Sequence, residues 1–138
     1  MKKSTEELLS LIQSAENIES YLKENEEELQ HWTLHGYLRH LMDEKQMKIS
    51  DVMNRSGQSD YVYKVFKNQR KVSRDILLAI AIGMECDLEE TQSMLRIACL
   101  ACLDPRNQKD AIIIYGILHR FSIMEINEVL FDLEESLL

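Results

Sequence analysis

The scarcity of chain-breaking residues constrains the fold of this sequence most, because one proline and four glycines occur among 138 residues. A sheet-rich domain needs many turns, and turns draw heavily on glycine and proline. Apolar residues recur instead at the three- and four-residue intervals of an amphipathic helix, as in Leu8, Ile12, Ala15, Ile18 and Leu22. The sequence therefore predicts an all-α chain.

Capping residues predict where most helices begin. Ser4 and Glu7 form a capping box ahead of a leader helix that runs to about residue 25, with a break near Ser14. The next expected helices span residues 33–45, 49–55, 59–68 with Ser59 as the N-cap, and 74–84 with Ser73 as the N-cap. Asp87 and Glu90 form the capping box of a further helix that continues to about residue 102.

Two helices are expected at the end of the sequence. Asp104 followed by Pro105 is a typical helix start and predicts a helix to about residue 121. Its segment "IIIY" has the propensity of a buried strand, but the preceding cap and the periodic length favour helix. Ser122 and Glu125 cap the last helix, whose apolar pattern continues through Leu133 and Leu137.

Charge is distributed unevenly along the chain, whose formal net charge is −8. Residues 1–30 carry −5 and residues 87–138 carry −6, whereas residues 31–86 hold nine basic and six acidic side chains, or +3. The stretch 61–74 contains no acid and five bases: Lys64, Lys67, Arg70, Lys71 and Arg74. A local basic stripe can meet phosphates even on an acidic molecule, because salt screens distant charges within about 8 Å.

Residues 49–74 have the order of parts of a helix-turn-helix unit. A short predicted helix ends at Ser56 and Gly57, and a glycine there can take the left-handed conformation that a tight turn needs. A second short helix follows, and then the basic stretch. In such units the second helix enters the major groove, where a few side chains reach base edges and phosphate contacts hold the register.

From Leu38 to about Ala98 the chain resembles the lambda-repressor-like, XRE-type helix-turn-helix family of transcriptional regulators. The resemblance depends on features in the family's order: Leu38-Arg39, Val52-Met53, the turn glycine Gly57, Ser59, "NQRK" at 68–71 and the helix opening "SRDILLAIAIGM". It implies a bundle of five short helices that binds double-stranded DNA. The sequence departs from the family's pattern at Lys48 to Ser50, Asn68-Gln69 and Val72, where the family commonly has a polar phosphate contact, a glycine and a proline.

The expected contacts with DNA come from the second helix and the residues behind it. The candidates for base edges are Ser59, Asp60, Tyr61 and Lys64, of which Asp60 would have to accept from a cytosine amino group. The candidates for phosphates are Lys48, Lys67, Asn68, Arg70, Lys71 and Arg74. The buried pair of this helix is either Tyr63 and Phe66 or Val62 and Val65. The alternative interpretation is that the lysines and arginines of this stretch contact no DNA and only keep an exposed helical hairpin soluble.

Other motifs argue against catalysis and against a metal site. No glycine-rich phosphate loop, HExxH or GxSxG occurs, so we predict no enzyme activity, no catalytic residue, no cofactor and no metal. Cys99 and Cys102 have the spacing of half a zinc site, but no second pair follows, so we expect them to pack in the core. His31 and His35 lack a third ligand and are expected at a solvated helix start.

These features together predict a sequence-specific DNA-binding regulator. Its expected parts are a helical leader over 1–30, a helix-turn-helix domain over 31–102 and a C-terminal hairpin over 103–138. The helix after Pro105 is apolar on most sides, so the hairpin is also the expected homodimer contact, with the candidates Ile113, Tyr115, Ile117, Ile126 and Leu130. The alternative is an acidic helical adapter, or an antitoxin-like accessory protein, that binds a protein partner.

The compartment follows from the sequence as well. No apolar run reaches the roughly 18 residues of a membrane span, and the N-terminus lacks the apolar core of a secretory signal. Three cysteines do not make a disulfide framework. We therefore expect a cytoplasmic protein with no membrane contact.

Overall fold

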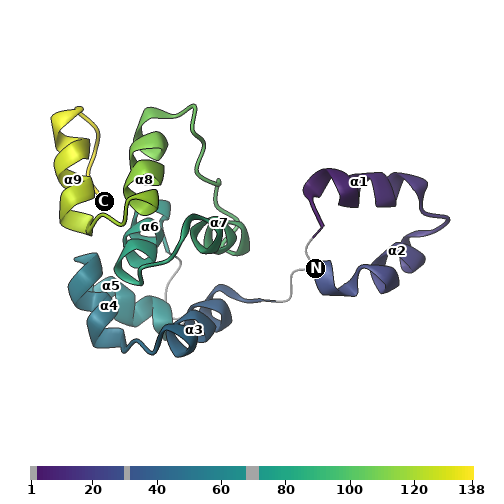
Figure 1. Cartoon of the computed structure of the whole chain (residues 1–138). Coiled ribbons are helices and arrows are strands. Elements are labelled where there is room, and N and C mark those ends of the chain that lie inside the picture. Colours follow the sequence, from purple (N-terminus) through teal and green to yellow (C-terminus); the bar gives the residue numbers. More distant parts are fainter. Residues whose placement is uncertain (1–2, 30–31, 68–71) are drawn as a thin grey trace. The chain divides into compact units, whose positions relative to one another are not determined.

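The computed structural model describes residues 3–29, 32–67 and 72–138, and for Ser59, Asp60 and Tyr61 it describes the backbone alone. Within these ranges helices are the only regular elements, which confirms the all-α fold (Figure 1). The chain divides into two compact units, residues 1–31 and 32–138, which are described separately here.

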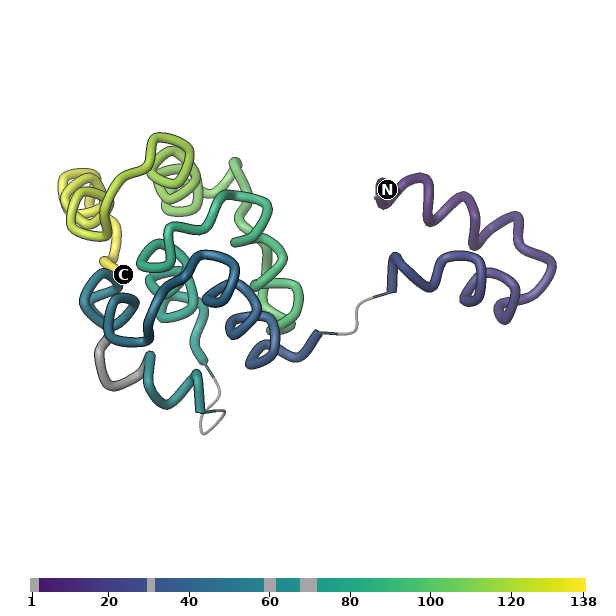
Figure 2. The backbone as a smooth tube through the Cα atoms, turned by 60° about the horizontal axis from the view of Figure 1, so that its bottom comes forward, coloured from purple at the N-terminus to yellow at the C-terminus, as the bar shows by residue number. Residues whose placement is uncertain are grey.

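The first unit is a helical hairpin (Figure 2). Helix α1 (Thr5–Ser14) begins where the Ser4 hydroxyl accepts the Glu7 N–H, and helix α2 (Ile18–Glu24) is followed by a short 3-10 turn, η1 (Glu26–Glu28). The predicted break near Ser14 therefore falls at residues 15–17, where Asn17 caps α2. No side chain of α1 is buried, because two short helices alone cannot enclose a core.

The second unit contains seven helices in the part of the chain that is described. They are α3 (Leu34–Lys45), α4 (Ile49–Ser56), α5 (Ser59–Phe66), α6 (Arg74–Gly83), α7 (Leu88–Ile97), α8 (Gln108–Leu118) and α9 (Ile123–Asp132). The expected caps of α6, α7 and α9 are confirmed: Ser73, Asp87 and Ser122 each accept an N–H from three residues ahead. Local sequence therefore sets these three helix starts.

Helix α6 lies at the centre of this unit, and every residue from Leu77 to Gly83 is buried. It packs against α4, α7 and α9 (Figure 1). A Cβ atom on Gly83 would lie 2.8 Å from the Ser56 backbone nitrogen, so only glycine lets the end of α6 approach the end of α4 this closely. The position of α4 therefore depends on Gly83.

The predicted bounds of three helices were wrong. Helix α8 starts at Gln108 with Asn107 as its cap, because the Asp104 carboxylate instead accepts the Arg106 N–H and forms a separate turn before the helix. Helix α7 ends at Ile97 and α9 at Asp132, each followed two residues later by a left-handed residue, Cys99 and Glu134. The segment "IIIY" lies inside α8, as predicted.

A candidate nucleic-acid interface

A tight turn joins α4 to α5. Gly57 takes the left-handed conformation, with φ 71° and ψ 12°, and the buried Ser56 hydroxyl accepts the Gln58 N–H at 3.2 Å. Gln58 occupies the N-cap position, so the prediction that Ser59 caps this helix was wrong and Ser59 is the first helical residue. The turn is one residue shorter than the sequence suggested, because Ser56 already belongs to α4.

Helix α5 is anchored by one apolar face. Val62 and Phe66 are fully buried, and Val65 is 4% exposed. Tyr63 is 48% exposed, so the pair Val62 and Val65 is the correct alternative, with Phe66 added to it. Because these three positions cover one side of a two-turn helix, Tyr63 and Lys64 face solvent.

Arg39 holds the carboxyl end of α5. Its guanidinium donates to the Phe66 carbonyl oxygen at 3.2 Å, and its Cζ atom lies 5.8 Å from the centre of the Phe66 ring. Cations near the last turn satisfy free carbonyls and complement the helix dipole. Sequence reasoning noted Arg39 only as part of a pattern and missed this positioning role, since its partner lies 27 residues away.

The candidates for base contacts lie at the start of α5. The backbone of Ser59, Asp60 and Tyr61 forms its first turn, while their side chains lie outside the described part. Lys64 is exposed one turn later. The structure thus places these four positions within the first six residues of a helix whose opposite face is buried.

Two candidates for phosphate contacts are exposed. Lys48 is the N-cap residue of α4, where its backbone N–H donates to Asp51 Oδ2 at 3.0 Å. Lys67 follows α5, and its ammonium lies 5.4 Å from the centre of the Tyr63 ring. The remaining candidates of the basic stretch, Asn68, Arg70 and Lys71, lie outside the described residues.

Arg74 has a different role from the predicted one. Its guanidinium donates to both carboxylate oxygens of Asp110, at 2.9 and 2.8 Å, and to the carbonyl oxygens of Ala101 and Cys102 at 3.0 and 3.2 Å. The hydrogen bonds with Asp110 raise the pKa of Arg74 further above its already high value. We remove Arg74 from the phosphate candidates, because its donors join α6 to α8 and the loop before it.

Asp110 is held ionised by this arrangement. Burial raises the pKa of Asp110, but the hydrogen bonds from Arg74 and the Asp104 N–H, with the charges of Arg74 and Lys109, more than offset it. Its pKa is therefore lowered from the usual value.

The candidates for the dimer contact are divided by burial. Ile113, Ile126 and Leu130 are fully buried in the chain's own core, so the prediction that they contact a second copy was wrong. Ile117 is half-buried, and Tyr115 is 53% exposed. The exposed apolar residues of this pair are Tyr115, Leu118, Met124, Phe131, Leu133 and Leu137, and an apolar groove of about 320 Å³ lies between α8 and α9.

The cysteines and histidines form no metal site that the structure describes. Cys99 is exposed and Cys102 half-buried, so the expectation that both pack in the core was wrong, because α7 ends before them. His35 lies in α3, and His31 lies outside the described residues. Over the described ranges no three His, Cys, Asp or Glu side chains are grouped so as to hold a metal ion, and no helix there is long and apolar enough to cross a membrane.

Comparison with known proteins gave one match. Residues 37–91 match the model of the Cro/C1-type helix-turn-helix DNA-binding domain, and they extend from α3 to the first half of α7. No curated protein and no solved structure matches the chain. The matched region contains the α4–turn–α5 unit and both exposed cations that flank it, Lys48 and Lys67.

Proposed function

We propose, from the premise that residues 37–91 are a Cro/C1-type helix-turn-helix DNA-binding domain, that this protein is a sequence-specific transcriptional regulator. One observation carries the proposal: α5 buries Val62, Val65 and Phe66 and leaves its other face, with Lys64, to solvent. A recognition helix needs this division, because its scaffold must fix one face while the other meets base edges.

In this proposal the first turn of α5 enters the major groove. Ser59, Asp60, Tyr61 and Lys64 then reach base edges, and a lysine can donate to guanine O6 and N7. The exposed Lys48 and Lys67, with Asn68, Arg70 and Lys71 of the basic stretch, contact the phosphates on either side. Arg39 acts as a positioning residue, since it fixes the end of α5 without being exposed at its start.

A homodimer completes the proposal. Two recognition helices placed about 34 Å apart read two half-sites one DNA turn apart, and this doubles the contacts of a single short helix. The support is the apolar surface of the α8–α9 pair, where the exposed Tyr115 and Leu133 line the groove and Phe131 is exposed on α9. A second copy can cover this self-complementary patch by two-fold symmetry.

Selection of bound duplexes from a random pool tests both sequence-specific DNA binding and the homodimer. We expect enrichment of sites with two-fold symmetry and half-sites about ten base pairs apart. Enrichment of a single, asymmetric half-site would reject the dimer and keep DNA reading, whereas a pool without enrichment would reject sequence-specific binding. The double variant Arg70→Ala with Lys71→Ala should weaken binding to all sequences and flatten the salt slope by about one to two units.

The runner-up function is a helical adapter that binds a protein. The observation that favours it is the apolar surface of the first unit, where Leu9, Ile12, Ile18 and Leu22 are exposed on an acidic hairpin. Large exposed apolar patches commonly mark protein contacts. Binding to mixed duplex DNA at low salt separates the two functions, because a regulator binds with affinity that falls steeply as salt rises and an adapter does not.

A further inference from the structure

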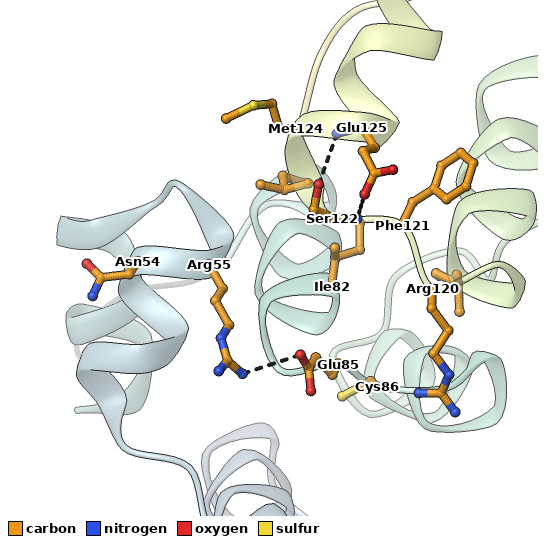
Figure 3. Close-up of a pocket in the computed structure, with 12 residues that line it drawn as sticks. Asn54, Arg55, Ile82, Glu85, Cys86, Arg120, Phe121, Ser122, Met124 and Glu125 are labelled. Carbon is orange, nitrogen blue, oxygen red and sulfur yellow. Dashed lines mark hydrogen bonds and ion pairs between the residues drawn. The ribbon is translucent and has the colours of Figure 1, made fainter.

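A pocket of about 580 Å³ lies where three helix ends meet (Figure 3). Its walls are the end of α4, the turn after α6, and the α8–α9 turn with the first residues of α9. The volume falls within the 300–1,000 Å³ of typical small-molecule sites. Because α4 is the first helix of the helix-turn-helix pair, the pocket spans the seam between that pair and the C-terminal hairpin.

The inner surface of the pocket is apolar. Ile82 and Cys86 are buried, and Ile117, Phe121 and Ile123 are half-buried around them. Burial, together with the charges of Glu90 and Asp87 and against that of Lys45, raises the pKa of the Cys86 thiol to about 12, so the thiol stays neutral. The surface can therefore hold a hydrocarbon chain or ring.

The charges at the rim are not equivalent. Glu85 pairs with Arg55 at 3.4 Å, and Glu125 Oε1 accepts the Ser122 N–H at 3.0 Å, so both acids are engaged. The Arg120 guanidinium makes no hydrogen bond or ion pair with any residue that the structure describes. In Figure 3 Arg55 and Arg120 extend from two sides of the pocket, with Glu85 and Cys86 between them.

Exposed ion pairs such as Arg55–Glu85 contribute little to stability, so this one leaves Arg55 able to exchange partners. A guanidinium binds a carboxylate with two parallel hydrogen bonds. We propose that this pocket binds a small amphipathic carboxylate, whose acid group pairs with Arg120 and whose apolar body lies over Ile82, Ile117 and Phe121. None of these residues is a candidate for a contact with DNA.

An NMR titration of the whole chain with octanoate tests the proposal. We expect saturable shifts of the amides of Ile82 and residues 117–123, with a dissociation constant on the order of 1 mM. Octanamide, which has the same shape without the charge, should bind about 5- to 10-fold more weakly. Arg120→Gln should reduce octanoate binding to the octanamide level, and Arg106→Gln, which changes an exposed arginine outside the pocket, should not.

Two results would overturn the proposal. The first is the absence of saturable shifts at these amides at octanoate concentrations up to about 20 mM, roughly twenty times the expected constant. The second is equal affinity for octanoate and octanamide in the unaltered protein, a comparison that does not depend on the folding of any variant. Since Gln46 already adopts the left-handed conformation that Arg120 has, glutamine fits the backbone at position 120. Neither result tests the proposed DNA binding, because the titration contains no DNA.

Discussion

The contact between Arg74 and Asp110 leads to a sharp prediction about stability. The Asp110 carboxylate is 7% exposed and accepts three hydrogen bonds, two from Arg74 and one from the Asp104 N–H at 3.0 Å. Asp110→Asn replaces one acceptor oxygen with an NH₂ group, which faces a donor of the guanidinium. The half-buried guanidinium of Arg74 thus keeps only one of its two acceptor oxygens on residue 110.

The size of the effect follows from burial. Breaking a fully buried ion pair costs about 3–5 kcal/mol, and Arg74, whose side chain is 26% exposed, regains some water. We therefore expect Asp110→Asn to lower the free energy of unfolding by about 2–3 kcal/mol. Urea denaturation at pH 7 measures it, with Asp132→Asn, an exposed aspartate at the end of α9, as a control that should change by less than about 0.5 kcal/mol.

The pH dependence gives an independent check. Because the pKa of Asp110 is lowered in the folded state, its contribution is complete above the unfolded pKa of about 3.9 and is lost as pH falls through the folded pKa. The difference between the unaltered protein and Asp110→Asn should therefore shrink below about pH 4. A variant as stable as the unaltered protein at pH 7, or a difference that grows in acid, would refute the reasoning.

Three further predictions concern packing, thiol reactivity and assembly. Gly83→Ala should lower the free energy of unfolding by about 1–2 kcal/mol in urea denaturation. The reason is that overpacking against the Ser56 backbone exceeds the gain of about 1 kcal/mol in helix propensity. A more stable variant would contradict the close approach of α6 to the end of α4. Iodoacetamide at pH 8 should modify the exposed Cys99 in the folded protein and leave Cys86 unmodified until urea unfolds the chain. Mass spectrometry measures both modifications, and equal modification rates of Cys99 and Cys86 in the folded protein would contradict this prediction. Phe131→Asp places a charge on an exposed apolar residue, so it should shift the protein towards the monomer mass in light scattering at micromolar concentration. A monomer mass for the unaltered protein would contradict the proposed dimer.

Much of the fold could be predicted from the sequence because its signals are local. The hydroxyl or carboxylate of Ser73, Asp87 and Ser122 caps a helix within three residues, so the chain needs no distant partner to start there. The same holds for Gly57, whose left-handed conformation follows from the need for a tight turn. Gly57 thereby sets the turn between α4 and α5, the unit that positions the candidate interface.

The errors arose where a distant partner decides the outcome. Asp104-Pro105 is a good helix start locally, but Asp110 takes the Asp104 N–H and the helix begins three residues later, after Asn107. Arg74 was predicted to contact phosphate because its partner, Asp110, is 36 residues away in the sequence. The role of Arg39 was missed because its partner, the Phe66 carbonyl oxygen, is 27 residues away. Sequence spacing carries no information on such pairs.

Three of the five dimer candidates, Ile113, Ile126 and Leu130, were wrong for a related reason. A helix that is apolar on most sides needs more cover than one neighbour gives, but the sequence does not say whether the same chain or a second chain supplies it. Here Ile113, Ile126 and Leu130 are buried in the chain's own core, while Tyr115 and Phe131 are among the apolar residues of this hairpin that stay exposed.

The central claim is that the exposed face of α5 reads DNA while the cations behind it hold the backbone. Dissociation constants for a selected and a scrambled duplex, each measured across a salt series, test this claim most directly. We predict that Lys67→Ala weakens binding to both duplexes equally and lowers the salt slope by about 0.9 units. Lys64→Ala should instead weaken binding to the selected duplex by an additional 1–3 kcal/mol or so, and Arg106→Ala, the control, should change neither quantity. The account would be contradicted if Lys67→Ala and Lys64→Ala, like the control, had the same salt slope and the same preference for the selected duplex as the unaltered protein.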